Sequence, residues 1–276
     1  MKQLFITDLD GTLLNPESRV SERSASIISS LSRQGVLITV ATARTPATVE
    51  PLFQHTVTTP PAIVLTGAAM WDRTEHRYIE PRYFLPTEAD EIMELCRECG
   101  LSPFRYTIGH DNIIHSYYKG TPSIKEQKFI DERSHLGLKR IHINEPYNAA
   151  AAAGTILIFA LGPADTIYKA AECLRQRGGC SVSDYPDIFN SSVAYLEIFA
   201  PGVSKADAAR RLREHTGADR LTVFGDNLND LPMMAVADVA VAVANALPQV
   251  KEAADVVIES NATDAVARYI AEHAEI

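Results

Sequence analysis

Two acidic side chains, two residues apart, follow the first apolar segment of the chain. Residues 4–7 are apolar or β-branched, and Asp8 and Asp10 come directly after them. In an extended backbone, residues i and i+2 project to the same side, so we expect both carboxylates to face one spot. Gly11 allows a sharp turn, and Thr12 is expected to hydrogen-bond the backbone of that turn. Taken alone, the stretch is equally consistent with a solvated turn after a buried strand.

Other polar side chains stand directly after segments that are typical of buried strands. Thr42 and Arg44 follow the segment 36–40, and Lys205 stands at the start of a predicted helix. The segment 221–225 is followed by acidic and amide side chains, namely Asp226, Asn229 and Asp230. Because ligands of open parallel α/β sheets bind beyond the carboxyl ends of the strands, these side chains are expected to share one site. Each could alone be a helix cap or a turn residue, but capping does not explain their repetition at several strand ends.

Asp8, Asp10 and Asp226 cannot lie together without a compensating charge. Two unit charges about 4 Å apart repel by roughly 4 kcal/mol at an effective dielectric constant of about 20. Oxygen ligands shared with water and a phosphate suit Mg²⁺ better than Zn²⁺, for which the sequence has no matching set of His and Cys residues. Lys205 is expected to supply the remaining positive charge. The sequence therefore predicts a magnesium site.

The elements that must position these residues form an alternating pattern of strands and helices. The segments 4–7 and 36–40 are expected to be parallel strands, joined by a helix that Ser21 caps and Gly35 terminates. Continuous β-branched runs are typical of strands buried on both faces, as in a parallel sheet. Further strands are predicted at 62–66, 194–199, 221–225, 239–243 and 256–258. The predicted fold class is α/β, with a Rossmann-like parallel-sheet core.

The pattern changes from about Trp71 onward, where short alternating segments mix with helical ones and aromatic residues gather. This change indicates an inserted α+β cap domain, expected to hold an antiparallel sheet covered by helices on one face. We place the cap domain at residues 83–191 and the core at residues 1–82 and 192–276. An insertion of this kind is expected to exclude bulk water and to select the substrate, as lids generally do.

Composition and charge disfavour several classes of protein. The chain has 276 residues, of which 46% are hydrophobic and 22% are charged, as in globular proteins with a full core. Its net charge of −9, with no cluster of Lys or Arg, disfavours a nucleic-acid partner. No apolar segment approaches the roughly 20 residues that span a bilayer, and the first strand leaves no room for a signal peptide. We therefore expect no membrane partner and a cytoplasmic location.

The four cysteines fit a reducing compartment. Cys96 and Cys99 form a C-x-x-C pattern, but Cys173 and Cys180 do not make a second pair with this spacing. Ordinary thiols are therefore favoured over a zinc site, and all four cysteines are expected to be reduced.

Four motifs occur in an order that is typical of a known family. The first two are Asp8-x-Asp10-Gly11-Thr12 and Thr42 after a buried strand. The last two are Lys205 at the start of a late helix and Gly225-Asp226-x-x-Asn229-Asp230. Together they resemble the signature motifs of the haloacid dehalogenase-like hydrolase superfamily. The large insertion, with Asn229-Asp230-x-x-Met233 and Asn245-Ala246, is similar to the Cof-type sugar-phosphatase branch.

This resemblance implies a phosphatase that uses Mg²⁺ and an aspartyl-phosphate intermediate. Asp8 is the implied nucleophile, and Asp10 is the implied acid that protonates the leaving group and then activates water. The implied metal ligands are the carboxylates of Asp8 and Asp226 and the backbone carbonyl of Asp10. Asp230 is expected to orient Lys205 or metal-bound water. Binding of the substrate phosphate is implied for Thr42, Lys205, Arg44 and Asn229.

The implied substrate is a small phosphorylated metabolite, in the first place a sugar phosphate. Asp10 favours phosphoryl transfer over dehalogenation, because the dehalogenases of the superfamily lack an acid at this position and a halide leaves without a proton. A phosphomutase stays open, since an aspartyl-phosphate can pass its phosphoryl group to a second sugar hydroxyl. A non-catalytic phosphoacceptor module is the alternative from another class of protein.

The chain departs from the family pattern at a few small residues. Ala43 and Ala206 stand where the family has glycine. Positive φ costs an alanine about 1 kcal/mol, so we expect neither position to be left-handed. Gly67, with the two alanines after it, replaces an Asn-Gly-Ala sequence, which removes one polar group near the site.

Overall fold

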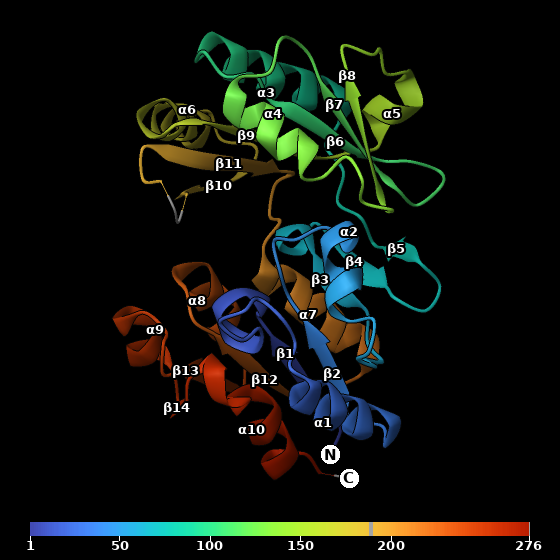
Figure 1. Cartoon of the computed structure of the whole chain (residues 1–276), viewed down its shortest axis with the longest axis vertical. Coiled ribbons are helices and arrows are strands. Elements are labelled where there is room, and N and C mark those ends of the chain that lie inside the picture. The colour runs from blue at the N-terminus through green and yellow to red at the C-terminus, as the bar shows by residue number, and fades with distance from the viewer. Residues whose placement is uncertain (188–189, 276) are drawn as a thin grey trace. The chain divides into compact units, whose positions relative to one another are not determined.

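The chain folds into two compact units, which we describe separately. The structure is a computed structural model that describes residues 1–187 and 190–275. The first unit comprises residues 1–80 together with the chain from Ser204 onward, and the second comprises Pro81–Val203 (Figure 1). The chain thus leaves the first unit after Glu80 and returns to it at Ser204, so the second unit is inserted into the first in sequence.

A five-stranded parallel sheet forms the centre of the first unit, in the order β14-β13-β12-β1-β2. Its strands are β1 (Gln3–Thr7), β2 (Leu37–Val40), β12 (Arg220–Gly225), β13 (Val239–Val243) and β14 (Val256–Ile258). The inner strands are almost fully buried, which explains their continuous apolar sequences. Figure 1 shows β1 from the start of the chain beside β12 from its last quarter. The predicted α/β core is therefore confirmed.

A small antiparallel sheet continues from the parallel one. It holds β3 (Ala62–Val64), β4 (Ala69–Asp72) and β5 (Arg77–Ile79), in this order. A single parallel bridge between Ala41 and Ile63 joins β3 to the end of β2. The segment 62–66, predicted as one strand, is therefore shorter as a strand and ends in the tight turn η3 (Leu65–Gly67).

Two helices of the first unit have ends that the sequence indicates, one beginning after Ser21 and one ending before Gly217. Ser21 caps α1, its side chain accepting a hydrogen bond from the Ser24 amide at 2.9 Å. Gly217 follows α7 in the left-handed conformation, with φ of 62°. The helices are α1 (Glu22–Arg33), α2 (Pro46–Val49), α7 (Lys205–Thr216), α8 (Leu231–Met234), α9 (Pro248–Ala253) and α10 (Ala265–His273). Shorter turns are η1 (Leu9–Leu13), η2 (Glu50–Leu52), η4 (Leu228–Asp230) and η5 (Asn261–Thr263).

The second unit is built on a six-stranded sheet in the order β10-β11-β9-β6-β7-β8. Its strands are β6 (Phe104–Ile108), β7 (Ile114–Tyr118), β8 (Lys139–Ile143), β9 (Thr155–Pro163), β10 (Ser181–Pro186) and β11 (Val193–Phe199). Its helices are α3 (Pro86–Glu98), α4 (Ile124–Asp131), α5 (Ala149–Ala153) and α6 (Ala164–Arg177). Aromatic rings of Phe104, Phe129 and Phe159 pack against one another between α4 and the sheet.

Two details of this unit differ from the prediction. The strand 194–199, expected in the core, is β11 and pairs with β9 and β10 of the second unit. The predicted return to the core at residue 192 therefore comes too early. The sheet is also mixed, because β7 and β8 are parallel. The error in β11 has a simple cause, since a strand buried on both faces reads alike in either sheet and does not reveal its partners.

The cysteines and the alanines at positions 43 and 206 agree with the predictions from the sequence. All four cysteines are free thiols, and Cys96 is buried. Neither Ala43 nor Ala206 is among the described residues with positive φ, as expected. In the part of the chain that the structure describes, we find no helix with the length and apolarity that crossing a membrane requires.

Lys139 is a buried base in the second unit and makes the stability of the protein depend on pH. Its side chain is 5% exposed, and its ammonium group donates to the Tyr106 hydroxyl at 2.7 Å. Burial, aided by the nearby charge of Arg133, lowers the pKa of Lys139 to about 7. Above this pH the unfolded chain binds a proton that the folded chain has released. The free energy of unfolding is therefore expected to rise from pH 7 to pH 9, by up to about 1.4 kcal/mol per pH unit.

Urea unfolding at pH 7, 8 and 9 measures this slope. Lys139→Met should remove it and stabilise the protein at pH 7, because methionine needs no proton in either state. Lys128→Met is the matched control, since the Lys128 side chain is 78% exposed and its loss should leave the slope unchanged. An equal slope in wild type and Lys139→Met would rule out this assignment.

Candidate active site

The side chains expected to do chemistry lie beyond the carboxyl ends of three neighbouring strands. Asp8 follows β1, Thr42 follows β2 and Asp226 follows β12, and β1 pairs with both other strands. The backbone amide of Asp8 extends the pairing by one residue, donating to the carbonyl of Phe224 at 3.0 Å. The parallel sheet therefore brings together residues more than 200 positions apart.

Lys205 is the buried centre of the site. As the first residue of α7, it is 2% exposed, and its Nζ donates to Asp8 Oδ1 at 2.5 Å and to Asp230 Oδ1 at 2.8 Å. Ser204 caps the helix, its side chain accepting from the Asp207 amide at 3.1 Å. This cap fixes the direction in which α7 presents the lysine.

Gly67 allows α7 to approach the site. Its φ is +97°, and a Cβ atom at this position would lie 2.2 Å from the backbone oxygen of Ser204. The carbonyl of Gly67 also accepts a hydrogen bond from Arg211 Nη2 at 2.9 Å. A side chain at position 67 would therefore displace the very turn that carries Lys205.

Asp226 is held by the turn that follows Asp8. Thr12 Oγ1 donates to Asp226 Oδ1 at 2.6 Å, rather than serving only its own turn as the sequence suggested. Gly11 has φ of +87°, and a Cβ atom there would lie 2.5 Å from Asp226 Oδ2. Glycine is therefore needed for the close approach of this carboxylate as well as for the turn.

Asp230 is a structural anchor within the site. It is fully buried, and its Oδ2 accepts from the backbone amides of Asp226 and Asn227, both at 3.1 Å. With Oδ1 bound to Lys205, both oxygens of Asp230 are engaged by the chain. Among the described residues, the carboxylate oxygens of the cluster that accept no hydrogen bond are Oδ2 of Asp8 and Oδ2 of Asp226.

Burial disfavours the ionised form of two carboxylates in the cluster, whereas the ammonium of Lys205 stays charged. Burial raises the pKa of Asp8 to about 7 against the opposing charge of Lys205, and it raises the pKa of Asp226 to about 6 against the hydrogen bond from Thr12. Burial also opposes the charge of Lys205, but its two carboxylate partners outweigh burial and raise the pKa of Lys205. We therefore take Lys205 as charged at neutral pH.

The donor set fits a hard divalent cation. Asp8, Asp226 and Asp230 each offer a carboxylate oxygen, and these oxygens lie within 4.8 Å of one another. Among the described residues, these three acids form a group whose spacing could hold a metal ion. With all three carboxylates ionised, the cluster and its one ammonium would carry a net charge of −2, which a divalent cation would balance and which burial disfavours in its absence. Asp8 Oδ2 and Asp226 Oδ2 are the oxygens open to it, and carboxylate oxygens are the ligands that Mg²⁺ prefers.

Asp10 and Arg44 form a separate pair at the edge of this cluster. Arg44 Nε donates to Asp10 Oδ2 at 2.8 Å, and Arg44 Nη2 donates to Asp10 Oδ1 at 2.6 Å. The Asp10 side chain is 53% exposed. We expected the two acids of the first motif to face one spot, but Asp10 binds Arg44 whereas Asp8 binds Lys205. The turn η1 begins at Leu9, between the two acids, so Asp8 and Asp10 do not lie on one continuous strand, although Asp10 itself has extended φ and ψ of −77° and 113°.

The remaining predicted residues lie in the loops around the cluster. Thr42 is buried, and its Oγ1 accepts from the Arg44 amide at 3.1 Å. Asn229 is exposed, in the turn η4 that begins α8. Asn245 has a contact that the sequence did not indicate, because its Nδ2 donates to the carbonyl of Gly11 at 2.7 Å. Its place just after β13, at the same edge of the sheet, is the signal that could have revealed it.

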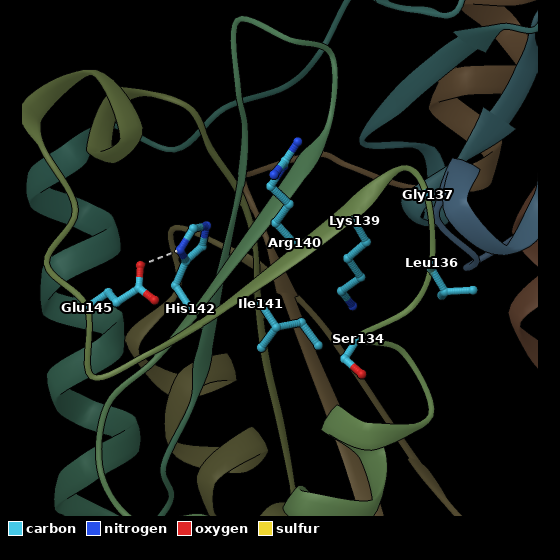
Figure 2. A pocket seen from close by; sticks show the side chains of 8 residues that line it. All are labelled: Ser134, Leu136, Gly137, Lys139, Arg140, Ile141, His142 and Glu145. Carbon is cyan, nitrogen blue, oxygen red and sulfur yellow. Dashed lines mark hydrogen bonds and ion pairs between the residues drawn. The ribbon is translucent and has the colours of Figure 1, made fainter.

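The second unit has a pocket of its own. It has a volume of about 460 Å³ and lies along β8. Figure 2 shows that Lys139 and Arg140 project from opposite sides of the strand, while His142 is turned toward Glu145, with Nδ1 2.7 Å from Oε2. These polar groups do not converge on one ligand. The cluster around Lys205 is therefore the candidate active site.

The chain is similar to known proteins over almost its whole length. The haloacid dehalogenase-like hydrolase family matches residues 5–270. The 5-amino-6-(5-phospho-D-ribitylamino)uracil phosphatase YcsE of Bacillus subtilis is 26% identical, and the match covers 97% of this chain and 94% of that protein. The pyridoxal phosphate phosphatase YbhA of Escherichia coli is 24% identical, and the match covers 98% of both chains.

Solved structures show the same fold. A haloacid dehalogenase-like hydrolase from Bacteroides thetaiotaomicron superposes with a TM-score of 0.79 at 22% identity, covering 99% of both chains. TM0651 from Thermotoga maritima superposes with a TM-score of 0.77 at 27% identity, covering 100% of this chain and 99% of that one. The likeness extends over both units of the chain.

Proposed function

The chain belongs to the haloacid dehalogenase-like hydrolases, and from this premise we propose that it is a Mg²⁺-dependent phosphatase of small phosphorylated metabolites. It is an enzyme of the phosphoric monoester hydrolase class. The observation that carries the proposal is the buried arrangement of Asp8 and Asp230 on Lys205, with Asp226 beside them. Such an arrangement holds one carboxylate ready as a nucleophile while keeping a fixed positive charge next to it.

Asp8 is the proposed nucleophile. Lys205 holds its carboxylate in place through Oδ1, and one carboxylate oxygen attacks phosphorus, so that the bond to the leaving alkoxide breaks and an aspartyl-phosphate forms. Lys205 then lies next to the transferring phosphoryl group, and Thr42 and Asn229 are proposed to bind its oxygens. Fixed donors aimed at developing charge stabilise a transition state without reorganisation. Asp230 positions Lys205 through the 2.8 Å hydrogen bond.

Asp10 is the proposed acid and base. It would give a proton to the leaving alkoxide and later take one from the water that hydrolyses the aspartyl-phosphate. The proposed magnesium ligands are the carboxylates of Asp8 and Asp226 and the backbone carbonyl of Asp10. When bound, Mg²⁺ supplies charge neutralisation that lets a phosphate dianion approach ionised carboxylates.

The proposed substrate is a sugar phosphate or a related small phosphate monoester. The two curated relatives are named for a ribitylaminouracil phosphate and for pyridoxal phosphate, which are both compact phosphate esters. Their cyclic parts differ, so a panel must include both kinds of compound as well as hexose and pentose phosphates. We also propose that the inserted unit selects the substrate. The proposed location of the enzyme is the cytoplasm.

Removal of divalent cations is expected to abolish activity reversibly. Phosphate release from p-nitrophenyl phosphate and from the panel should fall at least about 100-fold in excess EDTA. Without the cation, ionised carboxylates repel the substrate phosphate, and burial raises the pKa of the nucleophile Asp8, which disfavours its reactive ionised form. Added Mg²⁺ should restore the rate. Unchanged turnover in EDTA would contradict the proposed metal dependence.

The same assay separates the alternatives. Continuous release of inorganic phosphate without a sugar bisphosphate activator supports a phosphatase, whereas a requirement for the activator with little release indicates a phosphomutase. A phosphoacceptor module would take up one phosphoryl group per chain and then stop.

A further inference from the structure

The ion pair between Arg44 and Asp10 has the geometry of a clamp. Two parallel hydrogen bonds, 2.6 Å and 2.8 Å long, join the guanidinium to both oxygens of the carboxylate. A planar fork of this kind fixes the orientation of the carboxylate as well as its position, which a single point charge does not do. With both oxygens so engaged, the orientation of Asp10 depends on Arg44.

The backbone around Arg44 is itself held in place. Its amide donates to Thr42 Oγ1 at 3.1 Å, and its carbonyl accepts from the amide of Leu65 at 3.0 Å. The carbonyl of Thr42 accepts from the amide of Thr66, also at 3.0 Å. The loop that carries Arg44 is therefore fastened to the turn η3 at two points.

The turn η3 adopts an unusual conformation to make these bonds. Leu65 and Thr66 have φ of 53° and 56°, a backbone region that residues other than glycine rarely occupy. Strained backbone of this kind persists only where the surrounding structure enforces it, and it gathers at functional sites. Here the amides of both residues donate to the loop that carries Arg44, one to Arg44 and one to Thr42, so this turn holds the backbone of the loop in place.

From this geometry, and resting on the proposed phosphatase function, we propose that Arg44 is the positioning residue for the acid and base Asp10. Arg44 directs the Asp10 carboxyl group toward the leaving oxygen of the substrate. This role differs from the phosphate-binding role that the family resemblance implies for Arg44, and the two roles predict different kinetics.

The proposal predicts that the effect of losing Arg44 depends on the leaving group. An alkoxide needs a proton from Asp10 as it departs, whereas p-nitrophenolate is a stable anion and leaves without one. The quantity to compare is kcat/KM, because it reports the steps up to the first irreversible one and excludes the later hydrolysis of the aspartyl-phosphate. A phosphate-binding arginine would affect both substrates alike, since both carry the same phosphoryl group.

The test measures kcat/KM for glycerol 3-phosphate and for p-nitrophenyl phosphate with Mg²⁺ in wild type, Arg44→Gln, Asp10→Asn and the double variant. We expect Arg44→Gln to lower kcat/KM about 100-fold for the alkyl phosphate and less than about threefold for the aryl phosphate. The double variant should be no worse than Asp10→Asn alone, because both substitutions remove the same step. Arg44→Lys should not rescue activity, since an ammonium group cannot make the fork.

Calorimetric titration with inorganic phosphate provides a readout that needs no turnover. An affinity of Arg44→Gln for phosphate equal to that of wild type supports the positioning role. Equal losses of kcat/KM on both substrates, or phosphate binding weakened at least tenfold, would overturn it in favour of phosphate binding. Absence of turnover in wild type on every phosphate ester would instead refute the proposed function, and the titration would still decide between the two roles of Arg44.

Discussion

Asp8→Asn is expected to abolish phosphate release while leaving the fold intact. The amide oxygen of asparagine is a poor nucleophile, so no aspartyl-phosphate can form, and the loss in kcat should reach about 10⁴-fold or more. The measurement is phosphate release at saturating substrate and Mg²⁺. Any residual release in the variant marks the level of contaminating phosphatases, which makes the variant a control for the substrate panel as well.

The stability of Asp8→Asn should equal or exceed that of wild type. Burial raises the pKa of Asp8 to about 7, so ionising this side chain in the folded protein is unfavourable and a neutral amide avoids that cost. In the absence of metal, the raised pKa of Asp8 also makes the free energy of unfolding depend on pH. Between about pH 4 and pH 7, the folded chain keeps a proton on Asp8 that the unfolded chain has released. The contribution of Asp8 to the free energy of unfolding therefore falls as the pH rises through this range.

Thermal unfolding at pH 7 without Mg²⁺ checks this second half of the prediction. Asp165→Asn is a suitable control, since Asp165 is an exposed acid in the first turn of α6. An active Asp8→Asn variant would remove the nucleophile from the proposal. A variant that is inactive only because it fails to fold would show a lower melting temperature and would be recognised by it.

Lys205→Met is expected to lose both activity and stability. Methionine fills much of the same volume, but Asp8 and Asp230 would then lie buried without the ammonium group that both now contact, at 2.5 Å and 2.8 Å. Breaking a buried ion pair by removing one partner costs about 3–5 kcal/mol of unfolding free energy. Loss of the fixed charge beside the phosphoryl group should lower kcat by about 10²–10³-fold.

Two further variants test the cause of the instability. Asp230→Asn in the Lys205→Met background should recover part of the lost unfolding free energy, because it removes one of the unpaired buried carboxylates. Lys125→Met, which removes an exposed lysine, should change stability little. Urea unfolding of all four proteins gives the comparison. If Lys205→Met is as stable as wild type, the buried network does not hold the site together.

Much of the fold follows from patterns that extend over a few residues. The apolar runs of β1, β2 and β12 are strands because β-branched residues fill a sheet buried on both faces. Ser21 and Gly217 delimit their helices through local hydrogen bonds and local backbone freedom. Such features involve neighbours in the chain, so the residues alone determine them.

The location of the site is also readable in the sequence. Asp8, Thr42 and Asp226 each follow a buried strand, and parallel strands present their carboxyl ends at one edge of a sheet. Lys205 stands at the predicted start of its helix. The chemical types of these residues and the rule of parallel sheets together place them at one edge.

The choice of partner is what only the tertiary structure decided. Asp10 pairs with Arg44 whereas Asp8 pairs with Lys205, and Thr12 donates to Asp226 at a separation of 214 residues. The strand β11 joins the sheet of the inserted unit although its sequence would suit the core equally well. Local sequence determines whether a residue is buried and which side of its strand or helix it faces. Which distant side chain meets it depends on how the whole chain packs, because every buried polar group needs a partner and several distant candidates compete for it.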